Sequence, residues 1–297
     1  MALDNKGNSG AYTEAYYDQY ESTLSNGEAR IPICICVDTS SSMAFLNNDP
    51  SEWERTEKIS FEDGKTVRKV NMKPGCEPIR KIDRLHTVLK KMIDKMQKSD
   101  IISKAAVICI ISFDQFADCF IEFTDVTRIR PSSITNLEVG KDSTNSSKGI
   151  KMSLDRIDRL VAMNSDAGND RFVPVFVFMS DGVPTDGEEA DRAREMVRQR
   201  SENGKLNVIP ISICGDASGE RWLRGLSADS KVYRMDNERD FTTVFDGITE
   251  KIKKTTLVIA VDENDSNMVA EDDQDSTKYG PTCSLSDLES FMNESFI

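Results

Sequence analysis

Long apolar runs separated by amphipathic segments organise most of this chain. Continuous apolar stretches occur near residues 30–37, 104–113, 173–180 and 206–214, and each is bounded by polar residues. A strand that is apolar on both faces is typical of the centre of a parallel sheet, where helices cover both sides. Shorter apolar segments predict two further strands, at 118–124 and 231–235.

Between these strands, apolar residues recur at the spacing of an α-helix. The pattern predicts helices from Pro78 to about residue 96 and over about 146–163, 186–203, 219–227 and 239–254. Alternating strands and helices predict an α/β fold with a doubly wound, mostly parallel sheet and helices on both faces. The segment 118–124 follows its neighbour too closely for a helical crossover, so we expect one antiparallel edge strand there.

The main domain is expected to span residues 30–257, with additions before and inside it. Residues 1–29 form an N-terminal extension with a Tyr-rich helix, which either packs on the main domain or presents an aromatic face to a partner. Residues 45–78 are polar and are interpreted as an insertion. An Asp-Gly pair at 63–64, between two short apolar segments, predicts a small hairpin within it.

Acidic residues are concentrated at the end of the chain. The formal net charge of the 297 residues is −13, and −9 of it falls within 262–297. Residues 258–297 are therefore expected to form an acidic tail, and its last part, 284–297, has the pattern of a short amphipathic helix or of a frayed terminus. Because no basic face is evident, the charge argues against a nucleic-acid partner.

No segment has the features of a membrane span or of a secretory signal. The longest apolar runs fall far short of the ~20 residues that a membrane helix needs. The first ten residues are polar and lack an apolar core. We therefore expect a cytoplasmic protein that does not associate with membranes.

The cysteines are interpreted as small buried hydrophobic residues. Of the seven, Cys34, Cys36, Cys109 and Cys214 lie in the long apolar runs that predict buried strands. The chain has no Cys-x-x-Cys pair and one histidine, His86, so the sequence argues against a zinc site. His86, on the helix after Pro78, is expected to be structural or solvent-facing.

Polar side chains follow several predicted strands at the point where each strand ends. Asp38, Ser40 and Ser42 follow the first strand, Asp181 follows the strand at 173–180, and Thr144 lies just before a helix. In open α/β sheets, ligands bind beyond the carboxyl ends of the strands. Two carboxylates and three hydroxyls form an all-oxygen set that suits a hard divalent cation. The alternative is that these residues only cap helices or close turns.

This arrangement resembles the von Willebrand factor type A (VWA) domains over roughly residues 30–256. Asp38-x-Ser40-x-Ser42 matches their metal-ion-dependent adhesion site, and Thr144 and Asp181 look like the family's later ligands. The segments 180–186 (Ser-Asp-Gly-Val-Pro-Thr-Asp) and 111–113 (Ile-Ser-Phe) are most similar to those of the bacterial stand-alone VWA proteins of tellurium-resistance operons.

The resemblance implies a Rossmann-like fold that holds Mg²⁺, with Mn²⁺ or Ca²⁺ as alternatives. It implies that the serines and the threonine bind the ion directly, and that the aspartates bind directly or through water. An Asp or Glu carboxylate of a partner protein would fill an open position. Three further residues at the same rim are expected to lie just outside the ligands or to close turns: Asp114, Asp142 and Asp186.

Two departures from the family pattern concern the loops. Ser41 stands where many relatives have Gly, and Asp142-Ser143 replaces a Gly-Gly pair, which restricts the backbone. The loop that carries Thr144 is therefore expected to differ in shape from that of the relatives.

The leading hypothesis is thus a metal-dependent protein-binding module and not an enzyme. By resemblance, its setting is a bacterial stress-response or signalling complex with phosphatase or kinase neighbours, and the acidic tail could occupy the metal position itself. A metal-dependent phosphatase-like enzyme is one alternative, although no nucleophile with an adjacent base is evident. The other is a structural VWA domain with a degenerate metal site.

Overall fold

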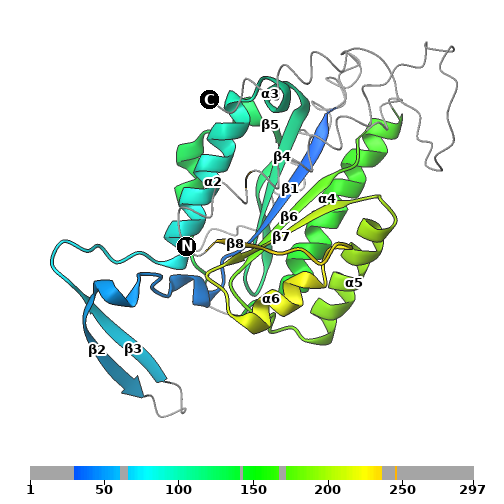
Figure 1. Cartoon of the computed structure of the whole chain (residues 1–297). Coiled ribbons are helices and arrows are strands. Elements are labelled where there is room, and N and C mark those ends of the chain that lie inside the picture. Colours follow the sequence, from blue (N-terminus) through cyan, green and yellow to red (C-terminus); the bar gives the residue numbers. More distant parts are fainter. Residues whose placement is uncertain (1–29, 61–65, 141–142, 167–171, 236–244, 246–297) are drawn as a thin grey trace, which may run out of the picture.

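A six-stranded sheet forms the centre of the molecule, in the order β5-β4-β1-β6-β7-β8 (Figure 1). The computed structural model describes residues 30–60, 66–140, 143–166, 172–235 and 245, and all structural statements concern these residues. The strands of the sheet are β1 (Ile31–Asp38), β4 (Ala106–Phe113), β5 (Ala117–Asp125), β6 (Val175–Ser180), β7 (Asn207–Ile213) and β8 (Tyr233–Met235). All neighbours pair in parallel except β4 and β5, which are antiparallel.

Helices cover both faces of this sheet, as the alternating pattern predicts. The α-helices are α2 (Lys81–Lys98), α3 (Asp100–Ala105), α4 (Ser146–Asp166), α5 (Glu188–Glu202) and α6 (Ala217–Arg224). Four short 3₁₀ helices connect elements: η1 (Ser41–Ala44), η2 (Pro50–Glu52), η3 (Val126–Arg128) and η4 (Pro131–Asn136). The predicted doubly wound α/β fold and the antiparallel edge strand are confirmed.

Two hydrophobic cores lie on opposite faces of the sheet. In β1, the side chains of Ile31, Ile33, Ile35 and Val37 belong to the core under α2. The two cysteines between them, Cys34 and Cys36, belong to the core under α4, α5 and α6. Every residue of β1 is buried, because successive side chains of a strand point to opposite faces and both faces are covered.

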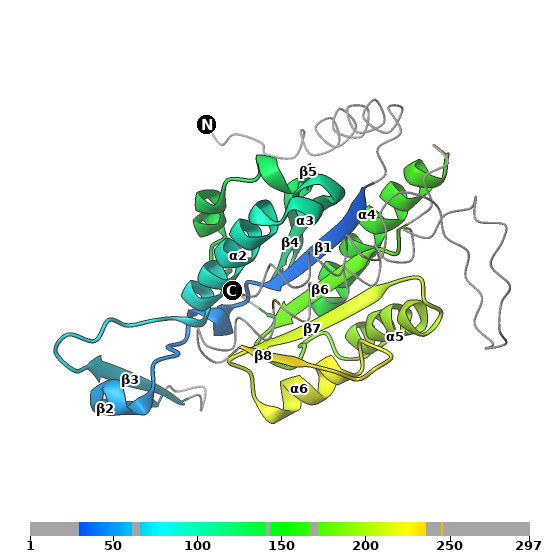
Figure 2. The same cartoon turned by 45° about the horizontal axis from the view of Figure 1, so that its top comes forward.

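A separate two-stranded hairpin extends from the body in both views (Figures 1 and 2). It consists of β2 (Trp53–Ser60) and β3 (Thr66–Met72), which pair antiparallel as the Asp-Gly signal predicts. Its base is held to the body by Asn48, whose side chain accepts from the backbone N–H of Ile79 and donates to the carbonyl of Glu77. This base lies next to η1, so the insertion begins directly after Ser40 and Ser42, two of the predicted metal ligands.

Several expectations from the sequence fall outside the described residues. These are the Tyr-rich extension, the acidic tail, the hairpin turn at 61–65 and, apart from Phe245, the helix at 239–254. The short helix α3 is one element that the periodicity missed, because six residues are too few to show a helical pattern. None of the helices in the described ranges combines the length and the apolar character needed to span a bilayer.

Candidate metal centre

The candidate ligands meet where the sheet changes its direction of winding. Strand β1 pairs with β4 on one side and with β6 on the other, so the loops after β1 and β6 lead away from each other. Such a point leaves a crevice at the carboxyl ends of the strands. Asp38 is the last residue of β1, and Asp181 directly follows β6.

Asp38 is fully buried and held by two donors. The backbone N–H of Ser40 donates to its Oδ1 at 2.8 Å, and the hydroxyl of Ser180 donates to its Oδ2 at 2.7 Å. Burial, followed by the negative charge of Asp181, raises the pKa of Asp38 to about 6. The protein therefore holds a carboxylate in an environment that disfavours its charge, which a bound cation would relieve.

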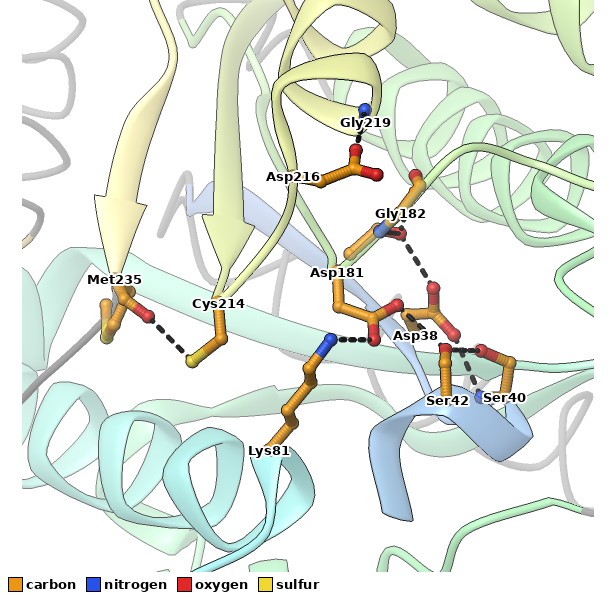
Figure 3. Close-up of polar contacts among 11 residues, drawn as sticks. Asp38, Ser40, Ser42, Lys81, Asp181, Gly182, Cys214, Asp216, Gly219 and Met235 are labelled. Atoms are coloured by element: carbon orange, nitrogen blue, oxygen red, sulfur yellow. Dashed lines mark hydrogen bonds and ion pairs between the residues drawn. The ribbon is translucent and has the colours of Figure 1, made fainter. Parts of the chain in front are cut away.

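Two serine hydroxyls connect the loop after β1 to Asp181 (Figure 3). The hydroxyl oxygens of Ser40 and Ser42 are 3.0 Å apart, and Ser42 donates to Oδ1 of Asp181 at 2.9 Å. Ser42 lies in η1, which is anchored by the fully buried Met43. The fold thus brings together four of the five predicted ligands, Asp38, Ser40, Ser42 and Asp181, in one hydrogen-bonded cluster.

Lys81 adds a cation that the sequence did not suggest. Its Nζ lies 2.8 Å from Oδ2 of Asp181, and Figure 3 shows it reaching across from the start of α2. The side chain of Lys81 is 17% exposed and that of Asp181 is 3% exposed. Only the apolar helical pattern marked this segment in the sequence, and the lysine was one of many on the polar face of that helix.

Thr144 lies on a neighbouring loop that is fixed to the segment after β6. Its backbone N–H donates to the hydroxyl of Thr185 at 2.9 Å, and its carbonyl accepts from the N–H of Thr185 at 3.0 Å. Thr144 is 8% exposed, and among the described residues its hydroxyl takes part in no hydrogen bond. The hydroxyl oxygen therefore has lone pairs available to coordinate a metal ion. It does not join the hydrogen-bonded cluster of the other four predicted ligands.

Two of the three acidic residues expected at the rim have contacts outside the Asp38 cluster. Asp114 accepts from the N–H of Phe116 and so closes the turn between β4 and β5. Asp186 accepts from the N–H of Ser147 in the first turn of α4. Both therefore close turns or cap a helix, which is one of the two roles expected for them from the sequence. Asp142 lies outside the described residues.

His86 is structural in the described fold. Its Nε2 is 2.8 Å from the carbonyl oxygen of Leu137, on the face of α2 that packs against η4. Burial is the main cause that lowers its pKa. It takes no part in the cluster around Asp38.

The donor set fits a hard divalent cation. Carboxylates and hydroxyls from Asp38, Ser40, Ser42 and Asp181 supply oxygen atoms, which Mg²⁺ and related ions prefer. The two carboxylates face each other closely enough for Asp181 to raise the pKa of Asp38. Buried like charges of this kind repel each other, and Lys81 supplies a single positive charge that offsets only one of them.

Known proteins resemble this chain in structure but not in sequence. No protein-family model matches the sequence, and no curated protein matches it. A mutant of the PilB minor pilin from Streptococcus sanguinis is 13% identical, with 77% of this chain and 62% of that chain covered and a TM-score of 0.51. Proximal thread matrix protein 1 from the mussel byssus is 13% identical, with 74% and 47% covered and a TM-score of 0.47.

A third solved structure, the manganese-loaded TRAP protein of Plasmodium vivax, is 12% identical. The match covers 73% of this chain and 72% of the TRAP chain, with a TM-score of 0.46. The likeness to the pilin shows a shared fold, and the fold of this chain is VWA-like. The chain spans about half the length of the mussel protein that it matches.

Proposed function

We propose that this chain is a divalent-metal-dependent protein-binding module, which captures an Asp or Glu carboxylate of a partner through Mg²⁺. The observation that carries the proposal is the single hydrogen-bonded cluster of two carboxylates and two hydroxyls at the switch point of the sheet. Ser40, Ser42 and Thr144 would bind the ion directly, and Asp38 and Asp181 directly or through water.

The charge of this donor set explains why a partner's carboxylate would bind. The hydroxyl ligands are neutral, so an ion that the two aspartates bind through water would keep part of its positive charge. Mg²⁺ requires near-octahedral oxygen coordination and usually keeps several waters. An acidic side chain could replace one of those waters. A bound ion would thus supply a Lewis-acidic contact, and the side chains of this cluster would hold that ion in place.

The surface around the site suits a protein partner. Five large apolar side chains are exposed in the described chain, and three of them lie in loops at this edge of the sheet. Phe45 follows η1 and is 57% exposed, Phe116 lies in the turn after β4 and is 61% exposed, and Val183 follows Asp181 and is 49% exposed. Exposed aromatic and apolar residues beside a polar anchor are typical of binding hot spots.

The identity of the metal in the proposal rests on the donor set. Among the structural neighbours, the mussel protein has been solved with zinc in its metal-ion-dependent adhesion site (MIDAS) motif, and the TRAP protein has been solved loaded with manganese. For this chain we propose Mg²⁺, with Mn²⁺ or Ca²⁺ as alternatives, because all the donors are oxygens. The similarity of residues 180–186 to the tellurium-resistance VWA proteins supports a cytoplasmic stress-response complex as the setting.

Binding and not catalysis is proposed for this site. In the part of the chain that the structure describes, the hydroxyls of Ser40 and Ser42 contact each other, and Ser42 donates to the Asp181 carboxylate that also holds Lys81. No histidine lies within this cluster to activate a nucleophile. A phosphatase-like activity would have to be observed with a generic phosphate ester and to disappear in Asp38→Ala.

The first experiment is thermal unfolding of the full chain in EDTA and then in Mg²⁺. A ligand that binds only the folded state at 100 times its Kd stabilises by about 2.7 kcal/mol. We expect a metal-dependent rise in melting temperature for the wild type and none for Asp38→Ala. Asp94→Ala is the matched control, because this exposed carboxylate pairs with Lys98 on the surface of α2, away from the Asp38 cluster.

The second experiment addresses the partner. Immobilised chain is incubated with lysate in Mg²⁺ or in EDTA, and captured proteins are tested again with Asp38→Ala and Asp94→Ala. A partner that binds the wild type and Asp94→Ala only in Mg²⁺ supports the proposal.

The unfolding experiment decides whether the metal binds at this site. If Mg²⁺ stabilises the wild type and Asp38→Ala equally, the metal is bound elsewhere and the proposal is wrong.

A further inference from the structure

A second group of potential metal ligands lies between the sheet and α4, away from the Asp38 cluster. It consists of Cys109 in β4 and of Cys119 and Glu122 in β5. Their sulfur and carboxylate ligand atoms all lie within 4.8 Å of one another. The sulfur atoms of Cys109 and Cys119 are 3.9 Å apart, and all six cysteines in the described chain are free thiols.

Irregular pairing of β4 with β5 brings these three side chains to one face. Cys119 and Glu122 are three positions apart, so a regular strand would point them to opposite faces. The register shifts twice between Ile108 and Ile111 of β4, and each shift is a bulge that changes the alternation. Glu122 consequently reaches Arg156, which projects from α4.

The distance between the two sulfurs matches a tetrahedral zinc ion. Zinc binds thiolate sulfur at about 2.3 Å, which places two thiolates on a tetrahedral ion about 3.8 Å apart. The observed separation is 3.9 Å. A third sulfur is close, because Cys34 in β1 is the register partner of Cys109 and its thiol contributes to the raised pKa of Cys109.

Glu122 has an oxygen to offer, and Arg156 balances the charge. Oε1 accepts from Nε of Arg156 at 3.2 Å, and the buried Oε2 lies 3.2 Å from the same nitrogen as an ion pair but accepts no hydrogen bond among the described residues. Two thiolates and a carboxylate with Zn²⁺ carry one net negative charge, which the Arg156 guanidinium neutralises. A buried site that is neutral as a whole avoids the cost of an unpaired buried charge.

We propose that Cys109, Cys119 and Glu122 form a zinc-binding site on the α4 face of the sheet, with Cys34 as the nearest further ligand. Binding forms zinc–sulfur and zinc–oxygen bonds and releases the two thiol protons to solvent. Spacing along the chain argues against zinc because the cysteines form no local pair, but strand pairing brings them together. The site is separate from the proposed Mg²⁺ centre and does not depend on it.

Burial explains why the empty site would be inert. Burial, together with the neighbouring cysteines, raises the pKa of the Cys109 thiol well above its usual value. Without metal the thiol therefore stays protonated and behaves as a core side chain. Zinc would connect the edge strand β5 to β4 in the body of the sheet, and through the Glu122–Arg156 ion pair to α4.

Cobalt is the probe that tests this site in the reduced full-length chain. Thiolate-bound tetrahedral Co²⁺ has a sulfur-to-metal charge-transfer band and strong visible bands, whereas Co²⁺ with only oxygen ligands, as at Asp38, has no such charge-transfer band. We expect these bands at one equivalent of Co²⁺ and their loss when Zn²⁺ is added. Cys119→Ser and Glu122→Gln should abolish or strongly weaken them, and Cys76→Ser, outside the cluster, should keep them.

Protection from alkylation provides a readout without any variant. Zn²⁺ should slow the alkylation of Cys119 in the wild type, as followed by peptide mass spectrometry, and should leave Cys76 unaffected. The proposal is overturned if the reduced wild type shows no thiolate band. It is also overturned if Cys119→Ser or Glu122→Gln gives a band equal to that of the wild type. Asp38→Ala should keep the band, so a failure at the Mg²⁺ centre is distinguished from a failure here.

Discussion

Replacing Lys81 with Met tests whether this ammonium group competes with the metal for Asp181. The Lys81 Nζ lies 2.8 Å from Oδ2 of Asp181, and both side chains are largely buried. Methionine keeps much of the apolar stem but removes the charge. In the proposed module, the same carboxylate also serves the metal, so the contact with Lys81 must be given up or weakened when the ion binds.

The size of the effect follows from the strength of that contact. A hydrogen bond to a charged group contributes about 1.5–3 kcal/mol. Because about 1.4 kcal/mol corresponds to a factor of ten, releasing this contact weakens metal binding by about tenfold to a hundredfold. We therefore expect Lys81→Met to bind Mg²⁺ more tightly by that factor. The metal-free variant should be less stable than the wild type by about 3 kcal/mol, since the buried Asp181 carboxylate loses its positively charged partner.

Calorimetric titration with Mg²⁺ and urea unfolding with and without Mg²⁺ measure both quantities. The control is Lys98→Met at the other end of α2, where Nζ lies 2.7 Å from Asp94 but the side chains are 73% and 50% exposed. An exposed pair of this kind contributes little, so the control should leave affinity and stability nearly unchanged. Equal or weaker Mg²⁺ binding in a folded Lys81→Met variant would refute the competition.

Three further changes test the site and its support. The pKa of Asp38 is raised from 3.8 to about 6, so the metal-free wild type should lose stability relative to Asp38→Asn as the pH rises from about 4 to about 6, by up to about 3 kcal/mol. Asp38→Asn should remove this dependence and the stabilisation by Mg²⁺ together, as urea unfolding across that pH range will show; a slope of the opposite sign contradicts the assignment. A Cβ on Gly219 would lie 2.9 Å from the Cα of Gly182, so Gly219→Ala should displace the Asp181 loop and weaken Mg²⁺ binding. The exposed Ser218→Ala serves as its control, and equal Mg²⁺ titrations for the two would count against the displacement. Phe178 is fully buried and stacks on a neighbouring ring at 5.3 Å, so Phe178→Ala should cost about 3–5 kcal/mol in urea unfolding, and a loss below 1 kcal/mol would mean that the core adapts.

The order of strands and helices is predictable from the sequence because it depends on local pattern. Continuous apolar runs mark β1, β4, β6 and β7, and the helical period marks α2, α4 and α5. The candidate ligands Asp38 and Asp181 are also predictable, since a polar residue after a buried parallel strand has a known place at the sheet edge. These inferences use neighbours in the chain, where spacing alone fixes which side chains share a face.

The contacts that set the chemistry of both sites were decided by the tertiary structure. Lys81 and Asp181 are 100 positions apart, and Ser180, which donates to Asp38, is 142 positions from it. Their proximity depends on which strands pair and on where α2 begins beside the sheet. The local pattern of side chains does not specify these choices. The convergence of Cys119 with the other two ligands of the proposed zinc site depends on bulges in β5 as well, because a shift of one residue in register moves a side chain to the opposite face.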